Sequence, residues 1–264
     1  GDKNKASGAS ISAPNASDFT WETVVTKNIG LDLGLLNNRL NMTADIYVRD
    51  TKDMLMASKD LPNVYGASSP KTNAANLRTK GWEASISWND SFNLKGKAFH
   101  YSVVLGLADN TTKVTKYNND NKTLGTPYEG QQLGEIWGYV VDGLFKTDEE
   151  AENYPVNQSY VNNILNISVK SQGLHAGDVK YVDLDGDNII SPTLSANDVK
   201  DQKVIGNSLP RYTYSVRLAA DWNGIDFSAL LQGVGRQHWY PMVKLVCSGV
   251  PMPVLIVLLF RRIS

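Results

Sequence analysis

The sequence is poor in the features that would assign it quickly to a common class of protein. It has one cysteine, Cys247, in 264 residues, which excludes an internal disulfide framework and any multi-cysteine metal site. Neither sign of charge dominates, because 26 lysines and arginines stand against 27 aspartates and glutamates. We therefore expect no nucleic-acid partner and no function that depends on net charge.

Long apolar runs are also scarce. A membrane-spanning helix needs about 20 consecutive apolar residues, and the apolar run at residues 250–260 has 11. Residues 1–20 are polar and lack the apolar stretch of a secretory signal, so we expect a polar loop there. These absences do not exclude strands that cross a membrane, since each such strand hides its apolar side in an alternating pattern.

Nothing in the sequence assembles into a catalytic site. The three histidines, His100, His175 and His238, are far apart and show no metal-ligand spacing. The chain also has no Gly-x-Ser-x-Gly motif and no phosphate-binding loop. We expect a protein that is not an enzyme and that requires no cofactor.

What the sequence does have is a strong alternation with a period of two. In residues 40–48 every second residue is apolar, and the residues between them are mostly polar. This pattern predicts a strand with one apolar and one polar side. Residues 24–36 carry a similar apolar side, and Asn37-Asn38 between the two segments accepts the positive φ of a tight hairpin turn.

Two more hairpins are predicted further along the chain. Residues 82–88 and 99–107 alternate in the same way, with a turn region at residues 89–97 between them. Residues 211–222 and 225–232 also alternate, and the Asn-Gly pair between them is the strongest short signal for a hairpin turn. The sequence thus predicts about six strands in three hairpins.

The connections differ in length at the two ends of these strands. Short turns lie within the hairpins, whereas long polar segments, residues 51–77 and 109–210, lie between them. Bacterial outer-membrane barrels have this layout, with short periplasmic turns and long extracellular loops. We therefore predict an all-β fold, a portion of an antiparallel transmembrane β-barrel. The alternative is a soluble or surface β-sandwich that binds carbohydrate, because a sandwich also has alternating strands.

The second long connection contains two local signals. Thr147 and Glu150 form a capping box, which predicts a short helix that ends near residue 154. A run of aspartates further on resembles the calcium loop of an EF-hand, with carboxylates at positions 1, 3 and 5 and a backbone carbonyl at position 7.

The candidate metal ligands are Asp183, Asp185, Asp187, Ile189 and Asp198. Position 12 of the loop is Leu194 rather than a glutamate, so Asp198 or Asn197 would have to complete the shell. The ion that this spacing suits is Ca²⁺. The alternative is that aspartates and glycine form only a polar turn here.

A set of short motifs is spread in order along residues 21–240. The densest are Gly-Glu-Ile-Trp-Gly-Tyr at 134–139, Asp-Gly-Leu-Phe at 142–145, the run at 177–184 and Pro-Arg-Tyr-Thr-Tyr at 210–214. In this order they resemble the SusC/RagA family of TonB-dependent outer-membrane proteins. The match covers the carboxy-terminal part of the family's barrel.

The resemblance implies a barrel of about 22 strands with a plugged lumen, surrounded by the lipid of a Gram-negative outer membrane. It implies import of oligosaccharides or peptides together with a SusD-type surface lipoprotein, powered through TonB. The segment that contacts TonB precedes the matched region in the family. Six strands do not close such a barrel, so we expect transport to be a property of the parent protein.

Two aromatic residues in the long connection are weak candidates for contact with substrate. Trp137 and Tyr139 could stack on a sugar ring. The alternative is that both pack inside a structured loop.

The last part of the chain, residues 242–264, departs from the pattern of residues 21–241. It is rich in leucine and valine, has two prolines and does not alternate. Its apolar run would be about 17 Å long as a helix, which is too short for a hydrocarbon core of about 30 Å. Our hypothesis is that the reading frame or the gene model changes near residue 241.

Overall fold

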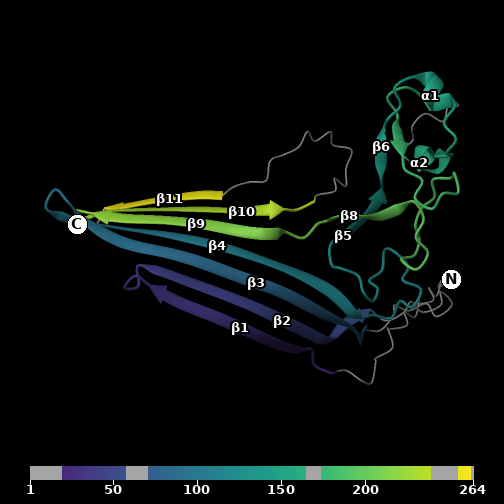
Figure 1. Cartoon of the computed structure of the whole chain (residues 1–264). Helices are drawn as coiled ribbons and strands as arrows, with labels where there is room; N and C mark the ends of the chain where they lie inside the picture. The colour runs from purple at the N-terminus through teal and green to yellow at the C-terminus, as the bar shows by residue number, and fades with distance from the viewer. Residues whose placement is uncertain (1–19, 58–70, 165–173, 239–254, 263–264) are drawn as a thin grey trace, which may run out of the picture.

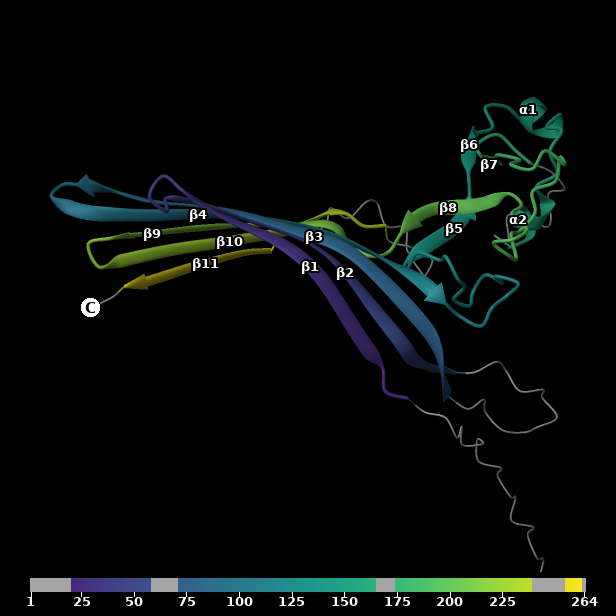
Figure 2. The same ribbon diagram turned by 60° about the horizontal axis from the view of Figure 1, so that its bottom comes forward.

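A computed structural model describes residues 20–57, 71–164, 174–238 and 255–262, and its main feature is one antiparallel sheet. The sheet has seven strands in the order β1-β2-β3-β4-β9-β10-β11. Their bounds are β1 (Thr23–Leu35), β2 (Leu40–Ala57), β3 (Lys71–Leu94), β4 (Lys97–Lys116), β9 (Arg211–Trp222), β10 (Ile225–Arg236) and β11 (Leu255–Arg262). The strands lie side by side in a single curved layer, and β1 does not pair with β11 (Figures 1 and 2). The predicted all-β fold and incomplete barrel are confirmed.

The three predicted hairpins are also confirmed. β1 pairs with β2 in one unbroken register, and the turn residues Leu36, Asn37 and Asn38 have φ of 55°, 57° and 63°. β9 and β10 are joined by Asn223 and Gly224, with φ of 50° and 78°. Positive φ at both central residues gives the turn a twist that matches that of the strands.

The hairpin of β3 and β4 is longer than predicted, and its turn is tighter. The expected turn region at residues 89–97 is wrong, because β3 continues to Leu94 and only Lys95 and Gly96 form the turn. Phe92 and Phe99 face each other across the two strands with ring centroids 5.0 Å apart. Such cross-strand aromatic pairs stabilise a ladder, which extends the strands past the polar residues that suggested a loop.

The expected long connections are shorter than predicted for a similar reason. β2 runs to Ala57 and β4 to Lys116, so each strand continues beyond the end of its apolar alternation. Arg78 on β3 donates to Asp50 on β2, with Nε to Oδ1 at 2.6 Å. Polar pairs of this kind hold the ladder together where no apolar side remains to predict it.

The strand register sorts the residues into an apolar face and a polar face. One row that crosses the first six strands is entirely apolar: Leu33, Met42, Ile86, Leu105, Val216 and Leu231. The row one residue further along, on the opposite face of the first six strands, is polar or small: Asp32, Thr43, Ser85, Gly106, Ser215 and Gln232. Adjacent residues of a strand point to opposite faces, so the sheet is apolar on one side only.

Between β4 and β9 the described residues 117–164 and 174–210 form a folded unit, here called the loop unit. Its elements are β5 (Glu135–Tyr139), β6 (Val141–Leu144), α1 (Asp148–Glu152), α2 (Ser159–Ile164), β7 (Val179–Tyr181) and β8 (Gln202–Asn207). The unit stands beyond one end of the sheet, and the three hairpin turns lie at the other end (Figure 1). No helix in the described part of the chain is long and apolar enough to span a membrane.

The predicted helix cap is confirmed at α1. The Thr147 hydroxyl accepts a hydrogen bond from Glu150 N at 3.1 Å, and the helix ends at Glu152. The Glu150 carboxylate accepts from Lys146 N at 2.9 Å rather than from the cap residue itself. The same carboxylate also binds the Lys180 ammonium at 2.8 Å, which ties α1 to β7.

The tail contributes one strand to the sheet. Of residues 242–264, the structure describes 255–262, which form β11 and pair with β10 from Ile225↔Arg262 to Gln232↔Leu255. A strand was not expected here, because the sequence LIVLLFRR does not alternate. Cys247 lies outside the described residues, and the hypothesis of a changed reading frame stays a prediction.

Candidate functional site

The apolar face of the sheet is exposed instead of forming a core. Ile29 on β1 is 73% exposed, Ile46 on β2 59% and Leu105 on β4 45%, although all three lie on the same face of the sheet. A soluble protein rarely leaves so large a contiguous apolar surface uncovered. This face suits contact with lipid, where the bilayer replaces the missing protein layer.

Aromatic rings gather on the apolar face toward the hairpin turns. The cluster consists of Trp88, Phe92, Phe99, Tyr101 and Trp222. Trp88 Nε1 donates to the Tyr101 hydroxyl at 3.2 Å, and Trp222 Nε1 donates to Leu94 O at 3.3 Å. Amphipathic rings with their polar atoms satisfied are typical of the interface between lipid and water.

The apolar face has the height of a bilayer core. On β3 it extends from Trp82 to Phe92, a rise of about 33 Å along the strand. At the strand tilt of about 40° found in membrane barrels, this corresponds to a band roughly 25 Å tall. The band therefore matches the apolar belt of an outer-membrane barrel.

The polar face carries two open hollows. The first lies near the turns, has a volume of about 730 Å³ and is lined by His100, Asp221 and Asp226 among others. The second lies further toward the loop unit, has a volume of about 620 Å³ and is lined by Asp45, Glu83 and other polar residues. A face of this composition suits the water-filled or plugged interior of a barrel.

The loop unit has a small core of its own. Phe145 is 2% exposed and Ile190 is fully buried. Phe145 packs edge-on against Tyr154 with centroids 5.1 Å apart, and the Lys180 ammonium lies 5.7 Å from the Phe145 ring. This core fixes the segment that leads into the aspartate loop.

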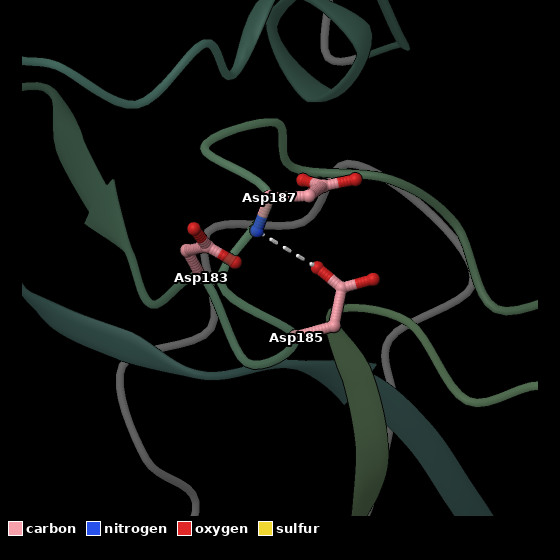
Figure 3. Close-up of side chains that lie close together, drawn as sticks. All are labelled: Asp183, Asp185 and Asp187. Atoms are coloured by element: carbon pink, nitrogen blue, oxygen red, sulfur yellow. Dashed lines mark hydrogen bonds between the residues drawn. The ribbon is translucent and has the colours of Figure 1, made fainter.

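The aspartate loop brings its three carboxylates together. One oxygen from each of Asp183, Asp185 and Asp187 lies within 4.8 Å of the others (Figure 3). Asp183 accepts from Gly186 N at 2.7 Å and Asn188 N at 2.8 Å, while Asp187 N points at the Asp185 carboxylate at 3.4 Å. Burial opposes ionisation of Asp183, but the N–H groups of Asn188, Gly186 and Asp187 outweigh it and lower the pKa of the carboxyl.

The other two predicted ligands are placed differently. The backbone at Ile189 lies beside Asn157, which hydrogen-bonds the carbonyl of Asn188 and the N–H of Ile190. Asp198 is not part of the three-carboxylate cluster; its carboxylate lies 3.8 Å from the Lys200 ammonium. Lys200 also lies 3.4 Å from Asp185, so a cation of the protein already borders the loop.

Sequence reasoning missed the residue that holds both ends of this loop. Asp201 is fully buried, and its two oxygens accept from Leu184 N at 2.8 Å and Ser191 N at 2.7 Å. It thereby clamps the loop at its start and at its end. No spacing rule points to Asp201, because its role depends on how the chain returns after residue 193.

The two aromatic candidates are built into the loop unit. Trp137 is half-buried on β5, and its indole N–H donates to Glu135 at 3.0 Å. Tyr139 packs edge-on against Tyr181 with centroids 5.6 Å apart, and burial raises the pKa of its hydroxyl to about 12. Neither residue lines the two hollows of the polar face.

A single curved antiparallel sheet with one lipid-suited face, short turns and a long folded loop defines a part of a membrane β-barrel wall. The family described as TonB dependent receptor-like, beta-barrel matches residues 4–242, so the chain belongs to this family. The resemblance to SusC/RagA-type receptors is confirmed. TonB-dependent receptors are transporters of the outer membrane of Gram-negative bacteria rather than enzymes.

Individual relatives agree with this assignment. The chain is 30% identical over 244 residues to TonB-dependent receptor P39 of Formosa agariphila, covering 81% of this chain and 22% of the relative. It is 26% identical over 228 residues to TonB-dependent receptor P3 of the same organism, covering 81% of this chain and 20% of the relative. The chain thus spans about a fifth of the length of the curated relatives it matches.

Solved structures share the fold. The structure of the RagAB peptide transporter superimposes with a TM-score of 0.57 at 19% identity, over 83% of this chain and 21% of that chain. The RagAB peptide importer in its open-open state gives a TM-score of 0.55 at 21% identity, over 82% of this chain and 21% of that chain. At these identities the likeness concerns the fold alone.

Proposed function

We propose that this chain forms part of the wall of an outer-membrane transporter that imports oligosaccharides or peptides. The parent protein would work with a SusD-type surface lipoprotein and draw energy through TonB, which would contact a part of the protein outside this chain. The observation that carries the proposal is the apolar row across the first six strands of the sheet, from Leu33 on β1 to Leu231 on β10. A lipid-embedded wall accounts for an apolar face that no other part of the described chain covers.

The second hollow of the polar face supports a role in passage of a hydrophilic solute. Its lining includes carboxylates, hydroxyls and the Gln232 amide, which offer hydrogen bonds to sugar hydroxyls or peptide groups. These groups do not discriminate between the two classes of solute. The proposal therefore names both oligosaccharides and peptides as transported solutes.

Fractionation of cells that express the chain tests the proposal. We expect the full chain in the outer-membrane fraction, with extraction by detergent but not by salt or alkali. Recovery as a soluble monomer would contradict the proposal and favour the β-sandwich alternative, in which the same strands bind carbohydrate.

We also propose that the aspartate loop binds Ca²⁺. Support comes from the three converging carboxylates and from the clamp at Asp201, which preforms the loop. Ca²⁺ would displace the Lys200 ammonium from Asp185 and would add ligands from backbone carbonyls such as that of Ile189. Asp198 would join only if its side chain left Lys200. The ion would stabilise the loop unit and take part in no reaction.

A further inference from the structure

A group of cations lies on the outward face of the sheet, directly beyond the apolar band at the loop-unit end. We call it the basic patch, and it consists of Lys27, Lys52, Arg78, Lys80 and Lys113. All five residues are exposed. The sequence alone does not reveal the patch, because its members come from four strands and only the strand pairing brings them together.

The register puts the patch on the same face as the apolar band. On β1, Lys27 lies two residues beyond Ile29, and on β3, Lys80 lies two residues before Trp82. Two residues along a strand return to the same face about 7 Å further on. Val48 pairs with both Lys27 and Lys80, so these two lysines stand in one row across β1, β2 and β3.

A second row adds Arg78 and Lys113. Asp50 pairs with Arg78, which in turn pairs with Lys113 on β4. Arg78 holds the Asp50 carboxylate at two points, 2.6 and 3.1 Å. Lys27 and Lys52 are the next cations within electrostatic reach of Asp50.

The patch carries a clear excess of positive charge. The two rows hold four cations and one carboxylate, that of Asp50, which leaves an excess of three positive charges. Lys52, which pairs with Thr23 on β1, adds a fourth. The four lysines form no ion pair with residues that the structure describes. Asp109, the next acid on this face, is already bound by Arg211.

The opposite border of the apolar band carries fewer cations. Its outward face holds the aromatic cluster and Lys97, which lies on the same face as Phe99 and donates to Asn223. Asp90 at this border pairs with Arg39 at 3.5 Å. In outer-membrane barrels the long loops lie outside and the short turns lie in the periplasm. With the sheet in that orientation, the basic patch is level with the headgroups of the outer leaflet.

We propose that the basic patch binds the phosphate groups of lipid headgroups in the outer leaflet. This inference rests on the proposed function, since it requires the apolar face to lie in the membrane. Lysine side chains lay their apolar stems along the band and place their ammonium groups at the headgroup level. A phosphate then accepts charge-assisted hydrogen bonds from several strands at once. The acyl chains of a lipid pack on the apolar band and hold its headgroup beside the patch. A soluble anion has no such second contact with this face.

The test uses the full chain and vesicles of three compositions. These are phosphatidylcholine alone, phosphatidylcholine with monophosphoryl lipid A, and phosphatidylcholine with lipid A from which the phosphate has been removed. The variant Lys80→Gln/Lys113→Gln removes two charges from the patch. Lys146→Gln/Lys203→Gln removes two exposed charges from the loop unit and serves as the control.

We expect the chain to bind vesicles with phosphorylated lipid A roughly tenfold more tightly than those with the dephosphorylated form. The patch variant should lose most of this preference and the control variant should keep it. Equal loss in both variants, or equal binding to both forms of lipid A, would overturn the proposal. Full competition by inorganic phosphate would also overturn it, because the site would then recognise the free ion.

Failure of the inference is distinguishable from failure of the proposed function. A chain that inserts into phosphatidylcholine but ignores the lipid A phosphate has a lipid-embedded face and no headgroup site. A chain that binds none of the three kinds of vesicle contradicts the membrane assignment itself, and with it the headgroup site.

Discussion

The Arg211 guanidinium donates two hydrogen bonds to the Asp109 carboxylate, from Nε to Oδ1 and from Nη2 to Oδ2, each 2.5 Å long. The two residues are 102 positions apart in the sequence, at the end of the apolar alternation of β4 and the start of β9. Their side chains are only 16% and 6% exposed. The pair therefore joins β4 to the start of β9, at the point where the chain returns from the loop unit to the sheet.

Breaking this pair should loosen the junction between sheet and loop unit. Asp109→Asn leaves the guanidinium without its charged partner, and we expect a loss of about 2 kcal/mol in unfolding free energy. Denaturant titration in detergent, followed by circular dichroism, measures it. Asp90→Asn removes an exposed strand-borne ion pair at 3.5 Å and should cost under about 1 kcal/mol. Equal losses in the two variants would show that Asp109 has no special role.

The contact between Glu150 and Lys180 should make the loop unit sensitive to pH. The Lys180 ammonium is the main cause of the lowered pKa of Glu150, and Glu150 is the main cause of the raised pKa of Lys180. A lowered carboxyl pKa stabilises the fold above the ordinary value near 4.3, and this contribution is lost as pH falls through the lowered pKa. The raised pKa of Lys180 stabilises the fold below about pH 10.4, the ordinary lysine pKa. This stabilisation is lost as the pH rises through the pKa of Lys180 in the folded state.

Hydrogen exchange of the amides in α1 measures the predicted loss of stability at low pH. Protection, corrected for the intrinsic rate, should fall below about pH 4 in the native chain. In Glu150→Gln the acid dependence should be weaker. Glu149→Gln, on the exposed side of the same helix, should behave as the native chain. A native-like acid profile in Glu150→Gln would remove the basis for this prediction.

Calcium should bind the aspartate loop in a saturable way. Asp185→Ala removes the middle carboxylate of the cluster, and we expect it to abolish the heat of binding in calorimetry. Asp120→Ala, in an exposed part of the same loop unit, is the matched control and should bind as the native chain does. No saturable heat in the native chain, measured against a chelated blank, would rule out the calcium site.

Gly81 should tolerate no side chain, because Tyr47 on the neighbouring strand covers it. A Cβ on Gly81 would lie 2.5 Å from the Tyr47 ring. We expect Gly81→Ala to destabilise the sheet by about 1–3 kcal/mol through overpacking. In a Tyr47→Ala background the same change should be nearly neutral. Gly106→Ala, which meets only the Ser215 hydroxyl, should cost less than Gly81→Ala in the native background.

The sequence predicted the hairpins well because their signals are local. Period-two alternation and the turns at Asn37-Asn38 and Asn223-Gly224 act within a few residues, so they are visible without the fold. The alternation ends before the strands do, so the sequence predicts loop for the outer parts of β2 and β4. Their pairing depends on partners such as Arg78 and Asp50, which only the register brings together.

The aspartate loop was partly predictable for the same reason. Asp183, Asp185 and Asp187 stand two residues apart in the sequence, and the structure brings their carboxylates together. Asp201 and Lys200 approach the loop from a later segment, so their contacts depend on tertiary folding. The strand β11 was not predicted either, since both sides of its sequence are apolar.

In the proposed function, the apolar face of the sheet lies in lipid and the polar face lines the interior of the barrel. Leu105 and Val104 are neighbours on β4 that point to opposite faces, Leu105 to the apolar one. The most direct test compares Leu105→Arg with Val104→Arg in the free energy of insertion into vesicles. We expect Leu105→Arg to weaken insertion by about 2–4 kcal/mol and Val104→Arg to change it little. Equal effects, or a larger effect at Val104, would contradict this assignment of the two faces.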